Sequence, residues 1–205
     1  TIRAAPRQTL IDFYDLFRDN WIRDASGNVI AIDRRFINSG GSLMRGVELD
    51  ANLNGEALGG RWSVNLNGSY INRFQTKPLQ SLPYSGNLVG QYVRYFNLPI
   101  RWKHTLNFGF SRGAFTHSLV QIYRDGYLDE EPISVSATPT SPTTYIPANW
   151  NPRVDEYSIW NYSLTWTGIE RLKLGFGIKN ILDTDPPFTA HMNDFAAGAG
   201  WETRI

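Results

Sequence analysis

The chain of 205 residues contains no cysteine, which excludes a disulfide framework and any zinc or iron–sulfur site built on thiolates. Its three histidines, His104, His117 and His191, show no metal-ligand spacing. No run of about 18 apolar residues occurs, so the sequence predicts no transmembrane helix. The formal net charge is only +1, and we therefore expect no nucleic-acid partner.

Aromatic residues are abundant by contrast, at 14% of the chain with 7 Trp and 10 Tyr, although the mean hydropathy is only −0.34. This combination suits a transmembrane β-barrel, in which half of each strand is polar and aromatic rings gather at the membrane interfaces. It suits a carbohydrate-binding β-sandwich equally well. The composition alone leaves both classes open.

The clearest pattern is a hairpin between Tyr157 and Asp183, in which two runs of alternating residues flank a short turn at 167–171. One face of the first run carries Trp160, Tyr162, Leu164 and Trp166, and one face of the second carries Leu172, Leu174, Phe176 and Ile178. Side chains alternate with period 2 along a strand, so this segment predicts an antiparallel pair with one apolar and one polar face.

Similar alternation predicts further strands, and the connections between them sort by length. The strands are expected at 43–54, 61–71, 101–110 and 114–125, with less regular ones at 8–23 and 29–38; no helix is expected. Short connections fall at 56–60, 112–113 and 168–170, and long ones at 74–99, 126–152 and beyond 183. Tight turns at one end and long loops at the other are typical of an outer-membrane barrel. The predicted fold is all-β: an antiparallel up-and-down transmembrane β-barrel segment, with about seven or eight strands of a larger barrel.

Three short segments carry a family resemblance. The segment Leu43–Leu49, LMRGVEL, resembles the "RGVE" strand of TonB-dependent outer-membrane receptors. LPIRWKH at Leu98–His104 resembles the proline-led strand that follows a long extracellular loop, and FGIKNILD at Phe176–Asp183 resembles the near-terminal "NLFD" strand end. Their order and spacing make the chain similar to the C-terminal part of such a barrel.

The resemblance implies that residues 1–205 are the C-terminal portion of a barrel of about 22 strands. The plug domain, the TonB box and the last strand would then lie outside this chain. It further implies a place in the outer membrane of a Gram-negative bacterium and active uptake of a small ligand of unknown class. The implied partners are outer-membrane lipid, the plug domain of the same polypeptide, and TonB through the absent N-terminal region. No enzymatic activity and no cofactor are expected. The alternatives are a soluble β-sandwich that binds or degrades glycans, and a passive porin.

Several motifs have a simpler reading than the chemistry they suggest. Gly109, Ser111 and Gly113 match the G-x-S-x-G nucleophile elbow, but that motif needs a strand-to-helix turn, and here we expect the turn of a hairpin. A turn at 112–113 would place Phe108, rather than His104, opposite His117. The acidic residues of 183–185 lack the later ligands of a calcium loop, which favours a solvated loop start.

The long loops are the expected place for ligand contacts, because binding residues concentrate in loops. The candidates, which could stack on a ligand or form charged hydrogen bonds, are Tyr123, Arg124, Tyr127, Asp129, Tyr145 and Trp150. The alternative for each tyrosine or tryptophan is an anchor at the membrane interface.

Overall fold

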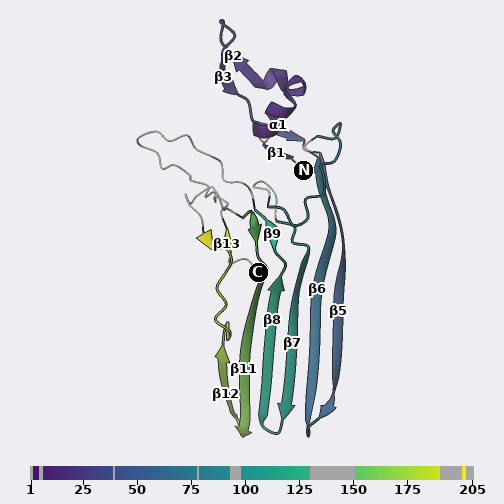
Figure 1. Ribbon diagram of the computed structural model, residues 1–205, viewed down its shortest axis with the longest axis vertical. Helices are drawn as coiled ribbons and strands as arrows, with labels where there is room; N and C mark the ends of the chain where they lie inside the picture. Colours follow the sequence, from purple (N-terminus) through teal and green to yellow (C-terminus); the bar gives the residue numbers. More distant parts are fainter. Residues whose placement is uncertain are drawn as a thin grey trace, which may run out of the picture. The chain divides into compact units, whose positions relative to one another are not determined.

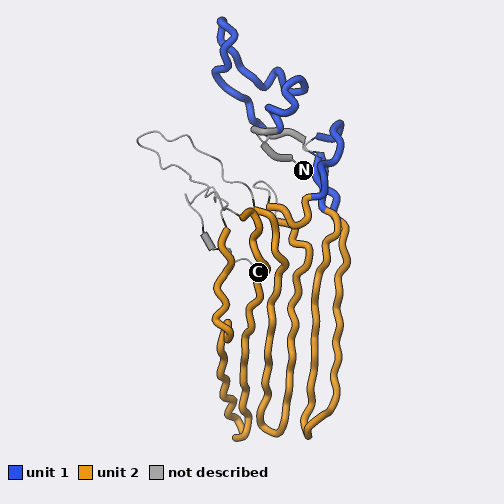
Figure 2. The backbone as a smooth tube through the Cα atoms, in the orientation of Figure 1, with its two compact units in different colours: residues 1–44, 74–87 blue, residues 45–73, 88–205 orange. Residues whose placement is uncertain are grey.

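The computed structural model describes residues 2–4, 7–38, 40–77, 79–92, 98–129, 151–189 and 200–201. The chain forms two compact units (Figure 2). Unit 1 contains residues 1–44 and 74–87, and unit 2 contains residues 45–73 and 88–205.

Unit 2 is built on a six-stranded antiparallel sheet with the strand order β12-β11-β8-β7-β6-β5 (Figure 1). The strands are β5 (Gly41–Ala57), β6 (Gly60–Lys77), β7 (Trp102–Arg112), β8 (Phe115–Arg124), β11 (Tyr157–Ile169) and β12 (Leu172–Ile178), and residues 41–44 and 74–77 belong to unit 1. These six strands have the same order in the sheet as along the chain, and each pairs with the next. This confirms the antiparallel up-and-down prediction. The sheet is open, and among the described residues no further strand pairs with β5 or β12.

Three tight turns join the strands of this sheet in pairs. Leu58 and Gly59, between β5 and β6, have φ angles of 55° and 69°, and two consecutive positive φ values are typical of a type I′ hairpin turn. Gly113 (φ 56°) and Arg171 (φ 64°) serve the other two hairpins. The connections cover residues 58–59, 113–114 and 170–171, so each overlaps its predicted range, and the second and third lie one residue or more later than predicted.

The register of the β7–β8 hairpin corrects one prediction. Phe110, and not Phe108, lies opposite His117. The reason is that Arg112 still pairs with Phe115, so the turn lies one residue later than expected and the pairing moves by two residues.

Shorter strands lie at the other end of unit 2. They are β9 (Tyr127–Leu128), which pairs with β10 (Arg153–Val154), and β13 (Phe188–Thr189), which pairs with β14 (Gly200–Trp201). The first pair lies within the long connection between β8 and β11, and the second follows β12.

Unit 1 contains the helices of the described chain, and it corrects the strand predicted at 8–23. Its elements are β1 (Ile2–Ala4), α1 (Arg7–Asp12), the 3₁₀ helix η1 (Tyr14–Asn20), β2 (Trp21–Arg23), β3 (Val29–Ile32) and β4 (Phe36–Asn38). Only the last three residues of the predicted strand are extended. Leu10 and Phe17 are buried, with Phe13, Trp21, Ile32 and Leu79 packed around them. Leu10 lies in α1 and Phe17 in η1, with Phe13 between the two helices, so the segment has no single helical period that alternation could be compared with.

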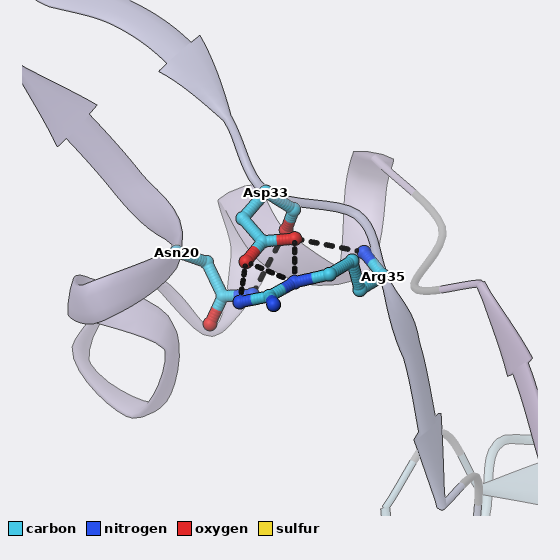
Figure 3. Close-up of polar contacts among 3 residues, drawn as sticks. All are labelled: Asn20, Asp33 and Arg35. Carbon is cyan, nitrogen blue, oxygen red and sulfur yellow. Dashed lines mark hydrogen bonds and ion pairs between the residues drawn. The ribbon is translucent and has the colours of Figure 1, made fainter.

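The strand predicted at 29–38 is divided into two, because residues 33–35 belong to neither β3 nor β4 (Figure 3). The Asp33 carboxylate accepts hydrogen bonds from the backbone N–H and the Nε of Arg35, at 3.0 Å and 2.8 Å. Asn20 Nδ2 donates to the Asp33 carbonyl at 2.8 Å. The hydrogen bonds from the Arg35 side chain, and then from its backbone, lower the pKa of the Asp33 carboxyl. β3 and β4 therefore pair with different partners, β2 and β1.

Candidate functional site

The two faces of the unit 2 sheet differ in chemistry, as alternation predicted. Strand pairing aligns one row of residues across the sheet: Val64, Phe108, Leu119, Tyr162 and Ile178. The adjacent row points the other way and contains Asn65, Asn107, Val120 and Asn161. We call these the apolar face and the polar face. The apolar face is uncovered in the described part of the chain, since Phe108 is 44% exposed.

Aromatic rings mark both ends of the apolar face. Near the tight turns stand Trp62, Phe110, Phe115 and Trp166, and near the long connections stand Tyr70, Trp102 and Tyr123. Trp102 and Phe110 on β7 are separated by about 26 Å of strand at about 3.3 Å per residue. That length is close to the apolar band of about 25 Å on the outside of transmembrane barrels, which two aromatic girdles flank.

The buried side chains in the described part of unit 2 lie at the loop end of the sheet. They are Val89, Pro99, Arg124, Tyr127, Val154, Tyr157 and Thr189. We call this region the loop junction, and define it as residues 88–92, 124–129, 151–157 and 188–189. Four segments that are distant in sequence meet there, so the long connections begin from a packed base.

Hydrogen bonds join the segments of the loop junction. The backbone N–H of Leu128 donates to the Gly90 carbonyl, and the N–H of Tyr92 donates to the Leu128 carbonyl, both at 2.8 Å. The Asp129 N–H donates to the Pro152 carbonyl at 2.7 Å, and Thr189 Oγ1 donates to Asp129 Oδ2 at 2.7 Å. Because buried backbone groups need partners, these bonds allow irregular chain to pack.

Arg124 lies at the centre of this junction with only 2% of its surface exposed. Its guanidinium carbon lies 5.6 Å from the ring centroid of Tyr127 and 5.7 Å from that of Tyr157. Nη1 donates to the carbonyls of Asp125 and Asp155, at 3.3 Å and 3.4 Å. Two aromatic faces and two carbonyl oxygens thus stabilise the buried cation, which ties the end of β8 to the start of β11.

A family model described as "TonB dependent receptor-like, beta-barrel" matches residues 8–181. The chain belongs to this family. No curated protein and no solved structure matches the chain. The match confirms the resemblance in the sequence and supports the all-β barrel class over a soluble sandwich. TonB-dependent receptors are receptors and transporters of the Gram-negative outer membrane and not a class of enzymes.

The receptor sheet brings four of the predicted ligand residues to its loop end. Arg124, Tyr127 and Asp129 belong to the loop junction, where each contacts its own chain. Tyr123 lies on the apolar face, where its ring stacks on His104 with centroids 5.0 Å apart. Ligand contact by these residues stays a prediction. Tyr145 and Trp150, the other two candidates, lie outside the described residues.

Sequence reasoning missed a chain of polar side chains on the apolar face of the receptor sheet. Trp102 Nε1 donates to His104 Nδ1 at 2.9 Å, and His104 Nε2 lies 3.2 Å from Gln121 Oε1. Gln121 Nε2 donates to Ser158 Oγ at 2.9 Å. The signal that could have revealed them is their position along each strand. His104, Gln121 and Ser158 are polar residues at positions where alternation predicts apolar side chains.

The remaining motifs have structural roles. Ser111 of the G-x-S-x-G motif lies in β7, and its Oγ donates to Thr116 Oγ1 across the hairpin at 3.1 Å, which confirms the expected turn. His117 Nδ1 lies 2.7 Å from the Tyr162 hydroxyl. Within the described ranges no three His, Asp or Glu residues are grouped as metal ligands, and His191 lies outside them. No described helix is long and apolar enough to cross a membrane.

Proposed function

We propose that residues 1–205 form the C-terminal portion of the barrel wall, with its loops, of an active-uptake receptor in the outer membrane. The observation that carries the proposal is the family match over residues 8–181, on a sheet with one apolar and one polar face. The plug domain of the same polypeptide and the last strand lie outside this chain. TonB acts through the N-terminal region and supplies the energy for uptake of a small ligand.

In this proposal the apolar face contacts outer-membrane lipid. Leu174 and Phe176 at the β12 edge are 53% and 58% exposed, which is favourable in hydrocarbon and unfavourable in water. The aromatic rings at the two ends of the apolar face form two belts, one at the turn end and one at the loop end, and these belts lie where the lipid head groups begin. The polar face, with Asn65, Asn107 and Asn161, lines the lumen and faces the plug domain.

The long connections of the receptor meet the small ligand. Their packed base at the loop junction supports this role, because binding loops need a rigid scaffold to hold their residues in place. Asp129, Tyr145 and Trp150 remain the proposed ligand contacts. Tyr123 lies on the apolar face, which contacts lipid in this proposal, so its proposed role is that of an anchor at the membrane interface. Arg124 and Tyr127 are buried, so their part in binding is to position the loops that follow them.

Two neighbouring substitutions on β11 test the assignment of the faces. Leu164 lies on the apolar face opposite His117, and Thr165 lies on the polar face opposite Thr116. In the full receptor, Leu164→Arg places a cation in lipid between the midplane and the aromatic rings of the turn end, and we expect a loss of about 1–3 kcal/mol. Thr165→Arg faces the lumen and should cost far less. Urea unfolding in lipid vesicles measures both values, and equal losses would overturn the proposal.

A further inference from the structure

The apolar face of the sheet contains a polar site that lipid contact alone does not explain. His104, Gln121 and Ser158 lie on three neighbouring strands, β7, β8 and β11, and form one hydrogen-bonded chain with Trp102. All four side chains are half-buried. Polar groups that face hydrocarbon are costly, so a site of this kind is expected to have a use.

The direction of the hydrogen bonds follows from Trp102. An indole N–H can only donate, so His104 Nδ1 must accept, and the proton of the neutral imidazole is then on Nε2. Nε2 donates to Gln121 Oε1, which leaves the Gln121 amide to donate to Ser158. This series of hydrogen bonds therefore runs from the Trp102 indole to the Ser158 hydroxyl, and the Ser158 O–H remains as a donor at its end. In the described part of the chain, Ser158 Oγ accepts this bond and makes no other.

Aromatic rings flank the His104 end of this hydrogen-bonded chain, and two acidic residues lie close in sequence to its other members. Tyr123 stacks on His104 with an interplanar angle of 22°, next to Trp102, whose ring lies over Gly68. A Cβ at Gly68 would be 2.5 Å from Trp102 Cη2, so the missing side chain is what allows the ring to lie there. Asp125 follows Tyr123 by two residues and Glu156 precedes Ser158 by two, so these acidic residues flank the Tyr123–Ser158 pair on the loop side.

This set of groups has the chemistry of a sugar site. Neutral donors bind the oxygens of hydroxyl groups, carboxylates accept hydrogen bonds from hydroxyl groups, and aromatic rings offer a flat apolar surface to a sugar ring. A bare anion fits poorly, because the carboxylates repel it. The site lies on the apolar face at the level of the loop-end aromatic belt, where a lipid head group would reach it.

We propose that the chain Trp102–His104–Gln121–Ser158 binds the sugar head group of a glycolipid in the surrounding membrane. The inference rests on the proposed function, because it needs the apolar face to contact lipid. Ser158 and Gln121 donate to the sugar oxygens, while Trp102 and His104 hold Gln121 in the orientation that leaves its amide as a donor.

The test uses the full receptor reconstituted in phosphatidylcholine vesicles that contain a galactosyl diacylglycerol. After mild detergent extraction, native mass spectrometry measures the glycolipid retained by each variant. We expect Ser158→Ala and Gln121→Leu to bind it about tenfold more weakly, which corresponds to the loss of about one hydrogen bond. The matched control is Ser118→Ala, which removes an equivalent hydroxyl from the polar face, where it donates to Asn107 Oδ1 at 3.0 Å. It should bind like the wild type.

Three results would overturn the inference. The first is equal retention by the wild type and by Ser158→Ala. The second is equal retention of sugar-free diacylglycerol or of anionic phosphatidylglycerol, which would leave the chain as a brace between strands. The third is a wild-type receptor that is a dimer and becomes a monomer on Ser158→Ala. That result would show that a second copy of the receptor, and not a glycolipid, binds at this site. Insertion of the variants into vesicles is measured first, so failed insertion of the wild type counts against the proposed function instead.

Discussion

The two ends of the unit 2 sheet are built in opposite ways (Figure 1). At one end, tight turns at Leu58–Gly59, Gly113 and Arg171 reverse the chain with positive φ angles. None of these turn residues is buried. At the other end, four segments pack around Arg124, and the buried side chains of the unit are found there. The turn end fixes how strands pair, whereas the loop end holds irregular chain in place.

This difference assigns separate tasks to the two ends. Register is set by turn geometry, and a slip of one residue would exchange the apolar and polar faces. The turn end must therefore be short, but it needs no core of its own. The loop end must support long connections against solvent, and buried aromatic rings and a buried cation provide that support. Substitutions at one end should leave the properties of the other end unchanged.

The largest expected effect is the accessibility of the two ends in cells. Under the proposed function the loop end faces outward and the turn end faces the periplasm. Arg153 and Glu170 are both exposed, one in β10 and one in the β11–β12 turn. In a full receptor without other cysteines, Arg153→Cys should react with an impermeant maleimide on intact cells, and Glu170→Cys should react only after lysis. Labelling of Glu170→Cys alone on intact cells would reverse the assigned orientation.

A smaller effect is expected from two arginine substitutions, one at each end. Arg124→Leu removes two hydrogen bonds and two ring contacts and leaves the carbonyls of Asp125 and Asp155 with one donor fewer. We expect it to lower the free energy of unfolding by about 2–3 kcal/mol. Arg112→Leu, the matched control, changes an exposed side chain at the turn end and should stay within about 0.5 kcal/mol.

Urea unfolding of the full receptor in vesicles measures both arginine variants. Limited proteolysis locates the damage, because Arg124→Leu should open new cleavage sites in 88–92 or 151–157 and leave the turns intact. If both variants lost the same free energy, the loop junction would not be the stabilising region that its burial indicates.

The same contrast explains what the sequence could reveal. Alternation predicted the strands of the sheet, because a period of 2 is a local property of each strand. It failed at 8–23, where two short helices follow one another and bury Leu10 and Phe17, because neither helix is long enough to show a period of its own. The sequence analysis also predicted the wrong partner for His117, Phe108 in place of Phe110, because alternation does not reveal the exact position of the turn at Gly113. The family match, and not any single motif, decided between barrel and sandwich.

The loop end was largely hidden from sequence reasoning. The long connections predicted where function would be sought, but they gave no sign that Arg124 would be buried between Tyr127 and Tyr157. These contacts join residues that are up to 33 positions apart, and no periodic pattern links them. The polar chain from Trp102 to Ser158 was hidden for the same reason, since it depends on register across three strands.

The smallest expected effect is a gain in stability at the turn end. Leu58 has φ 55° and is 83% exposed, so it holds a left-handed conformation without burying its side chain in return. Left-handed backbone costs an ordinary L-residue about 1 kcal/mol, whereas Asn adopts it readily, and Asn-Gly is the preferred pair for a type I′ turn. Because Gly59 already follows, Leu58→Asn should raise the free energy of unfolding by about 0.5–1 kcal/mol.

The control at this position is Leu58→Val, whose branched Cβ is less compatible with positive φ and should lower the free energy of unfolding. Urea unfolding of the full receptor in vesicles compares the two with the wild type. Proteolysis at the loop junction should be the same in all three, because the substitution acts on the turn alone. Stabilisation by Val, or a changed cleavage pattern around Arg124, would show that the two ends of the sheet are coupled.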